Sequence, residues 1–202
     1  MMADYTDFSL ITNKLPVSAI CGGIEYNFDT RTVKALQALY WLSLDEVPAI
    51  TRLGTALRLV VKNYDDITEE SVSELEKDVL DYLSGYPKIV NGRQSKKEVL
   101  SYIQDHDLIV SSFREAYGCT LEEIRSMHWW LFLAYLNGLP SNTRLANVIQ
   151  IRLTEITSKD SPETRRAKIQ AKQAVALRPR QIHGDGEDGM DIISAALEQQ
   201  GD

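Results

Sequence analysis

The segment from Thr120 to Asn137 constrains the fold more than any other part of this chain. Thr120 and Glu123 have the spacing of a capping box, in which each side chain satisfies a backbone amide at the start of a helix. We expect this helix to run to about Asn137, and its apolar residues cover most of its circumference. Such a helix must be packed by neighbours on several sides, so the sequence predicts a helical fold with this segment at its centre.

The aromatic residues of this segment are expected to form the core. Burial removes about 150–250 Å² of each large aromatic side chain from water. At about 25 cal/mol per Å², Trp129, Trp130 and Phe132 together would contribute on the order of 10 kcal/mol, which is an upper bound. His128 lies beside them, and we interpret it as a hydrogen-bonded core histidine rather than a metal ligand.

Residues 17–28 give the only clear strand signal. Val17–Ile20 and Ile24–Phe28 alternate between apolar and polar residues, and Gly22-Gly23 supplies the positive φ angles of a two-residue turn. A hairpin alone is marginally stable in water, so this one is expected to pack on a larger element.

After the hairpin, the spacing of apolar residues predicts helices up to residue 178. The acidic residues of the helix that begins at Thr68 are expected to form an outer surface; they are Glu70, Glu74, Glu76, Asp78 and Asp81. Later helices are predicted over Leu100–Ala116, after a cap at Ser141 or Asn142, and after the start signal Ser161-Pro162-Glu163.

These patterns predict a mainly α fold: a compact multi-helix domain with a small N-terminal β-hairpin. Residues 1–28 form the hairpin segment and residues 29–178 the helical core, which together make one domain. Residues 179–202 are expected to form a flexible acidic linker and a short terminal helix.

Composition excludes several classes of protein. Apolar residues make up 44% of the 202, as in a folded globular protein, and the net charge of −7 argues against broad nucleic-acid binding. Cys21 and Cys119 are far apart and are expected to be free thiols. No signal peptide is evident, and the longest apolar run, Met127–Leu139, is shorter than the roughly 20 residues of a membrane span. We therefore expect a soluble, cytoplasmic protein.

No catalytic or metal-binding pattern is present. His106 stands between two aspartates, but adjacent residues of a helix point in different directions and do not converge. An EF-hand calcium loop that began at Asp185 would place Met190 where glycine is required and Ala196 where the bidentate glutamate belongs, so we interpret this segment as a linker. We expect no enzymatic activity, no metal and no cofactor.

The segment Lys159–Gln181 carries seven basic and two acidic residues. It has two interpretations, which the sequence leaves open. One is a docking surface for an acidic helix or a nucleic-acid backbone, and the other is an exposed face that complements an acidic protein. The segment has no aromatic residue on which single-stranded bases would stack.

Two stretches, Phe113–Gly118 and Met127–Leu139, carry a resemblance to a known family. A tyrosine-glycine helix end, a capped helix, the triplet His128-Trp129-Trp130 and a Gly-Leu turn follow one another, and Leu15–Phe28 matches an N-terminal hairpin. This order resembles the bacteriophage Gp-fifteen-type family. The match covers about half of the chain strongly, whereas Lys88–Lys97 is short and the residues after Arg180 do not match.

The resemblance implies a tail assembly chaperone of a long-tailed phage. Such a protein binds the tape-measure protein and helps to recruit tail-tube subunits in the host cytoplasm, and it is absent from the mature virion. The family-signature core residues are His128, Trp129, Trp130, Phe132 and Gly138. The candidate partner-binding residues are Arg165, Arg166, Lys168, Lys172, Ile192, Ile193 and Leu197.

Three questions stay open at this point. Self-association is compatible with the sequence. A structural virion protein, such as a head–tail connector or tail-completion protein, is the first alternative function. A small nucleic-acid-binding regulator that uses Arg165–Arg180 is the second.

Overall fold

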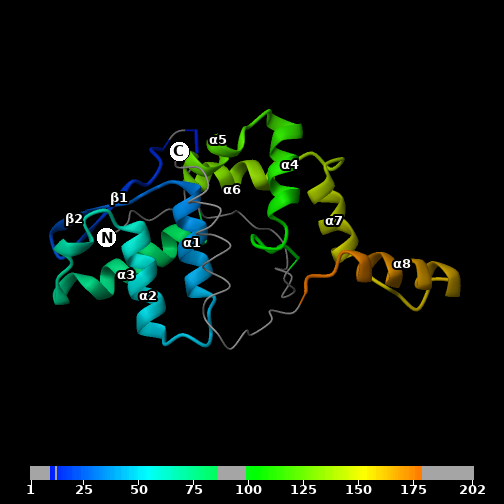
Figure 1. Ribbon diagram of the computed structural model, residues 1–202, viewed down its shortest axis with the longest axis horizontal. Helices are drawn as coiled ribbons and strands as arrows, with labels where there is room; N and C mark the ends of the chain where they lie inside the picture. The colour runs from blue at the N-terminus through cyan, green and yellow to red at the C-terminus, as the bar shows by residue number, and fades with distance from the viewer. Residues whose placement is uncertain (1–9, 12, 86–98, 179–202) are drawn as a thin grey trace, which may run out of the picture.

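The computed structural model describes residues 10, 11, 13–85 and 99–178. It is mainly helical, as predicted, with a two-stranded antiparallel hairpin near the N-terminus. The elements are β1 (Ser18–Cys21), β2 (Ile24–Asn27), α1 (Thr32–Leu42), α2 (Ala49–Val60), the 3-10 helix η1 (Tyr64–Asp66), α3 (Glu69–Ser84), α4 (His106–Tyr117), α5 (Leu121–Ser126), α6 (Trp129–Asn137), α7 (Arg144–Leu153) and α8 (Pro162–Ala174). The molecule is elongated, with the hairpin and α3 at one end and α8 at the other (Figure 1).

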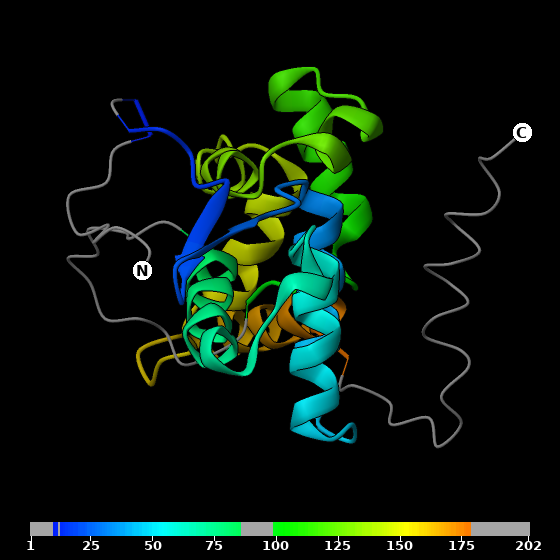
Figure 2. The same cartoon turned by 90° about the vertical axis from the view of Figure 1, so that its left-hand side faces the viewer.

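The hairpin has the predicted two-residue turn, and its strands are antiparallel. Ser18 pairs with Asn27 and Cys21 with Ile24, and both turn glycines have positive φ angles, 58° for Gly22 and 79° for Gly23. The hairpin lies against α3 (Figure 2), where the Tyr26 hydroxyl and the Ser71 hydroxyl are hydrogen-bonded at 2.7 Å. The strands therefore gain their stability from α3, as expected for so small a sheet.

One residue of the predicted acidic surface is buried instead. Asp78 is only 5% exposed, and its carboxylate accepts a hydrogen bond from the Cys21 thiol at 3.6 Å. Burial, together with the neighbouring Asp78 charge, raises the pKa of Cys21 to about 11. The prediction for Asp78 was wrong because the hairpin covers this face of α3. Cys21 and Cys119 are free thiols, as expected.

The predicted continuous helix from Thr120 to Asn137 was also wrong, because it is two helices, α5 and α6. The chain between them, at Met127-His128, is extended and forms an isolated antiparallel bridge with Arg31. The Met127 carbonyl accepts hydrogen bonds from the Thr32 amide and hydroxyl, at 2.8 and 2.9 Å. The Trp129 amide donates to the Thr30 carbonyl at 2.8 Å. The start of α1 thus replaces the helical hydrogen bonds at the break.

The core is built on α6, as the sequence predicted. Trp129 and Trp130 are both buried, and their indole N–H groups donate to the carbonyls of Leu83 (3.0 Å) and Tyr82 (2.9 Å) at the end of α3. The rings of Trp129 and Phe132 stack with centroids 5.5 Å apart. Because both indoles have hydrogen-bond partners, burying them leaves no unpaired donor.

In the described part of the chain, no helix is long and apolar enough to cross a membrane. The loop Lys88–Lys97 and the terminal helix predicted for Asp191–Gln200 lie outside the described residues.

Candidate functional site

The described residues do not include a metal site. No group of three His, Cys, Asp or Glu side chains within residues 13–85 and 99–178 could hold a metal ion. His106 is exposed at the start of α4, and its Nε2 lies 3.1 Å from the carboxylate of the exposed Asp107, so these two adjacent side chains do meet. Asp105 is buried and pairs with Arg152 instead. The candidate site is the surface that carries the predicted basic contact residues Arg165 and Arg166, which are exposed.

The family-signature residues are structural. His128 is half-buried and begins α6: its Nδ1 accepts from the Trp130 amide at 3.1 Å, and its Nε2 lies 3.0 Å from the Pro16 carbonyl. This pattern fits a neutral ring with its proton on Nε2. Gly138 ends α6, and a side chain there would lie 3.3 Å from the Ala134 carbonyl and the Tyr117 hydroxyl. These contacts show that the residues support the core.

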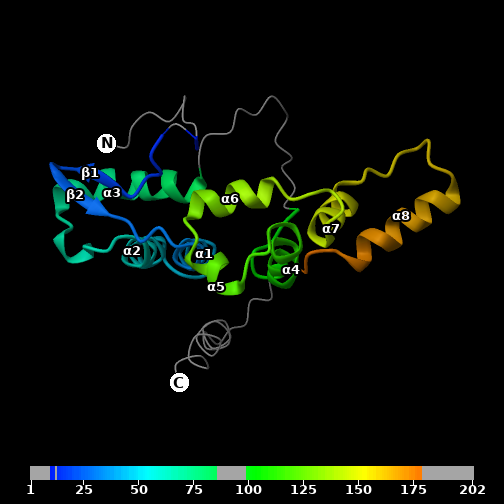
Figure 3. The same cartoon turned by 90° about the horizontal axis from the view of Figure 1, so that it is seen from above.

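Residues 143–178, which contain α7 and α8, form an arm that extends from the body of the molecule, residues 13–85 and 99–137 (Figures 1 and 3). The arm begins at Thr143, which is the N-cap of α7 in place of the predicted Ser141 or Asn142. Leu145 is fully buried, and its amide donates to the Ser112 hydroxyl of α4 at 3.2 Å. In contrast, no residue of α8 is buried.

The base of the arm is held by Arg152. Its guanidinium donates to both carboxylate oxygens of Asp105, at 2.7 and 2.8 Å, and to the carbonyls of Val99 (3.0 Å) and Val175 (2.6 Å). Burial raises the pKa of Asp105, but the bonds from Arg152 and from the Ser101 amide outweigh burial, so the pKa lies below its usual value. Arg152, near the end of α7, therefore connects the end of α8 to the start of α4.

Sequence reasoning missed the pairing of Arg152 with Asp105, although one signal was present. Arg152 falls seven residues after Leu145 and three after Ile149, which places a charge on the apolar stripe of its helix. A charged residue on such a stripe is expected to have a buried partner.

Two of the four predicted basic contact residues bind groups within the arm. Lys168 donates to the Asp160 carboxylate at 2.7 Å and to the Glu155 carbonyl at 3.1 Å. Lys172 donates to the carbonyls of Arg152 and Thr154, where α7 ends. The Lys172 ammonium thus satisfies carbonyls at the C-terminus of α7, and Lys168 attaches α8 to the loop that follows α7.

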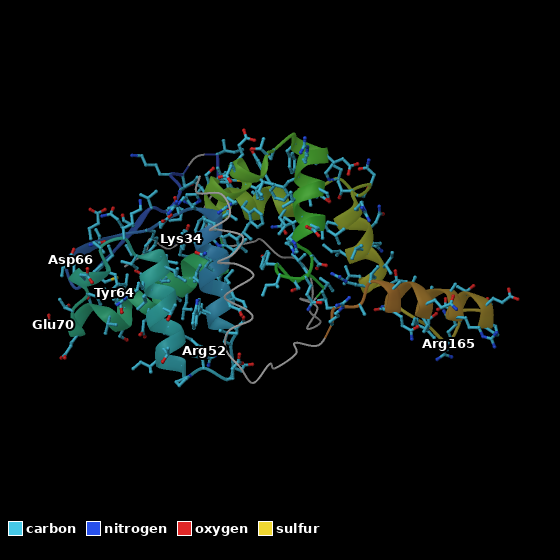
Figure 4. The ribbon with its side chains drawn as sticks, in the orientation of Figure 1. Lys34, Arg52, Tyr64, Asp66, Glu70 and Arg165 are labelled. Carbon is cyan, nitrogen blue, oxygen red and sulfur yellow. The ribbon has the colours of Figure 1, made fainter. Side chains whose placement is uncertain are left out.

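Arg165 and Arg166 are exposed on α8, and Figure 4 shows Arg165 at the far end of the arm. Ile169 follows Arg165 by four residues and Arg166 by three, so the three side chains are neighbours on the helix surface. Ile169 is 38% exposed, and Leu153 and Ile156 are also exposed on the arm. The arm thus presents exposed apolar side chains, of which Ile169 lies next to two arginines.

Charge differs between the two ends of the molecule. The arm carries eight basic and three acidic residues, whereas residues 64–81 carry eight acidic and one basic. Asp66 and Glu70 lie at the end opposite Arg165 (Figure 4). The basic face is therefore a local feature of an acidic protein. The other predicted contact residues, Ile192, Ile193 and Leu197, lie outside the described residues.

Comparison with known proteins supports the resemblance seen in the sequence. Residues 11–177 match the model of a family described as Bacteriophage Gp15 protein. The chain belongs to this family. Membership indicates a bacteriophage structural or assembly protein, and the match includes both the aromatic core and the arm of this Gp15 family protein. No curated protein and no solved structure matches the chain.

Proposed function

We propose that this Gp15 family protein is a tail assembly chaperone that binds the tape-measure protein and helps to recruit tail-tube subunits. The observation that carries the proposal is helix α8, which has thirteen residues, none of them buried, and yet is firmly attached at Lys168 and Lys172. An ordered helix with exposed isoleucine and arginine side chains is a suitable surface for another helix.

The physical basis is the packing of helix against helix. A tape-measure protein is a long helical chain, as the family resemblance implies, and its apolar stripes would aggregate without a partner. An amphipathic client helix could cover Ile169, Ile156 and Leu153, each at least 37% exposed. Burying this apolar surface is favourable by about 25 cal/mol per Å². Arg165 and Arg166 would pair with acidic residues beside the client's apolar stripe.

In the proposed function the protein acts by binding alone and catalyses no reaction. It works in the host cytoplasm before the tail is complete and leaves before the virion matures. Tail-tube subunits would bind elsewhere on the body, so that one chaperone could contact both partners.

Co-expression with the tape-measure protein tests this function. We expect the two proteins to copurify, and the tape-measure protein to be more soluble with the chaperone than without it. If the two purify separately and the tape-measure protein is equally soluble alone, the proposal is wrong. Mass spectrometry of purified virions provides the second arm, since stoichiometric presence of this chain would favour a structural virion protein.

A further inference from the structure

The exposed face of α8 is complementary to another part of the same chain. Arg165, Arg166 and Ile169 form one surface of α8, in which an apolar side chain lies next to two guanidinium groups. A partner that matches this surface needs apolar side chains and carboxylates close together in its sequence.

The C-terminal residues 179–202 have this composition. They include six acidic residues and one basic residue, and the apolar side chains Ile192, Ile193 and Leu197 follow the acidic run. The contrast in charge with the arm is large, because the arm carries an excess of five positive charges. Both the apolar and the charged parts of the α8 surface therefore have counterparts in this segment.

The segment is also within reach of α8. The described structure ends at Arg178, whose backbone N–H and carbonyl are hydrogen-bonded to the side chain of Gln104 at 2.8 and 2.9 Å. Thirteen residues of α8 span about 20 Å. Residues 179–190 can extend over up to about 40 Å, so Ile192 can reach Arg165 in the same chain. A short connection gives an effective concentration in the millimolar range, which favours contact within one chain over contact between chains.

We propose that residues 185–202 dock on the exposed face of α8 of their own chain, with Ile192, Ile193 and Leu197 against Ile169 and the carboxylates opposite Arg165 and Arg166. The docking does not depend on any client. One consequence rests on the proposed function: the segment would compete with the tape-measure protein for the arm.

The test uses the full-length chain with a spin label at residue 194, introduced as Ser194→Cys in a Cys119→Ser background, since Cys21 is buried. NMR signals of the α8 amides report the distance to the label. We expect the amides of residues 165–169 to lose intensity in dilute solution and to recover it at high salt, because the contact is partly electrostatic. Full intensity at these amides would overturn the proposal.

Three variants and one mixing experiment define the contact. Arg165→Glu/Arg166→Glu should abolish the loss of intensity, and adding Asp188→Lys/Asp191→Lys should restore it. The matched control Lys62→Glu/Lys77→Glu makes the same charge change at exposed positions away from the arm and should leave the loss unchanged. An arm variant that behaves like wild type would contradict the proposal. Equal broadening of an unlabelled isotope-enriched chain mixed with a spin-labelled one would show contact with a second copy and would overturn docking within one chain.

Discussion

Arg152 and Asp105 form a buried ion pair that attaches the arm to the body, with two guanidinium–carboxylate hydrogen bonds of 2.7 and 2.8 Å. The residues are 47 positions apart in the sequence. The same guanidinium binds the Val99 and Val175 carbonyls, so it joins the start of α4, the end of α7 and the end of α8. The orientation of the candidate binding surface therefore depends on one buried arginine.

Removing this arginine should be costly. Arg152→Met leaves the Asp105 carboxylate buried without its partner, which destabilises proteins by about 3–5 kcal/mol. Replacing both residues, as in Asp105→Leu/Arg152→Met, removes the unpaired charge and should recover part of the loss. Urea denaturation measures the free energy of unfolding of both variants. An Arg152→Met protein whose free energy of unfolding lies within about 1 kcal/mol of wild type would show that the ion pair is not essential.

Replacing a core tryptophan should destabilise the fold rather than weaken partner binding selectively. Trp130→Ala removes a buried ring and its hydrogen bond to the Tyr82 carbonyl, and we expect a loss of about 3–5 kcal/mol in the free energy of unfolding. Tyr135→Ala, at an exposed aromatic residue of the same helix, should cost much less. A stable, folded Trp130→Ala variant that lost only its partner would place the binding surface at the core helix instead.

His128 should make stability depend on pH. Burial lowers the pKa of His128, whereas the hydrogen bond to Pro16 acts in the opposite direction. The unfolded chain, with a histidine pKa near 6.5, therefore takes up a proton that the folded chain does not, and stability falls as pH decreases below about 6.5. Above that pH the contribution is fully present.

Denaturation at pH 7.5 and pH 5.5 checks this prediction. The expected loss is at most about 1.4 kcal/mol, the most that one titrating group can contribute over the single pH unit between 6.5 and 5.5. His128→Asn keeps a capping side chain without a titrating group and should reduce the difference. An unchanged difference in His128→Asn would assign the effect to other groups.

Replacing two glycines by alanine should change the stability of the protein in opposite directions. Gly54 lies inside α2 with no atom within 4 Å of an added Cβ, so Gly54→Ala should stabilise the protein by up to about 1 kcal/mol. Gly85 has a φ of 93°, and an added Cβ would lie 2.5 Å from the Leu133 Cδ1 atom. Gly85→Ala should therefore destabilise by about 1–3 kcal/mol. Thermal unfolding of the pair measures both signs, and changes of equal sign would contradict the assigned backbone conformations.

Local signals in the sequence predicted most of the fold. The capping box of Thr120 and Glu123 forms as expected, Ser161 caps α8, and the turn glycines 22 and 23 have positive φ angles. Each of these features depends on residues within a few positions, which is why composition and spacing were sufficient.

The wrong predictions have a common cause, because the features involved depend on contacts between residues that are far apart in the sequence. The break at Met127-His128 depends on hydrogen bonds with Thr30 and Thr32, and Asp78 is buried by the hairpin. The candidate surface was predicted only in part for the same reason. Helical spacing located Arg165 and Arg166, but it did not reveal that Lys168 and Lys172 bind carbonyls and a carboxylate within the arm.

The proposed binding of the tape-measure protein to the arm can be tested by measuring the affinity of that complex in matched variants. Arg165→Glu/Arg166→Glu changes the exposed face of α8, and Lys62→Glu/Lys77→Glu makes the same charge change elsewhere. We predict that wild type and the Lys62/Lys77 variant bind the tape-measure protein equally, and that the arm variant binds at least about tenfold more weakly, a change of about 1.4 kcal/mol. Equal affinity in all three proteins, or no binding by wild type, would contradict the account.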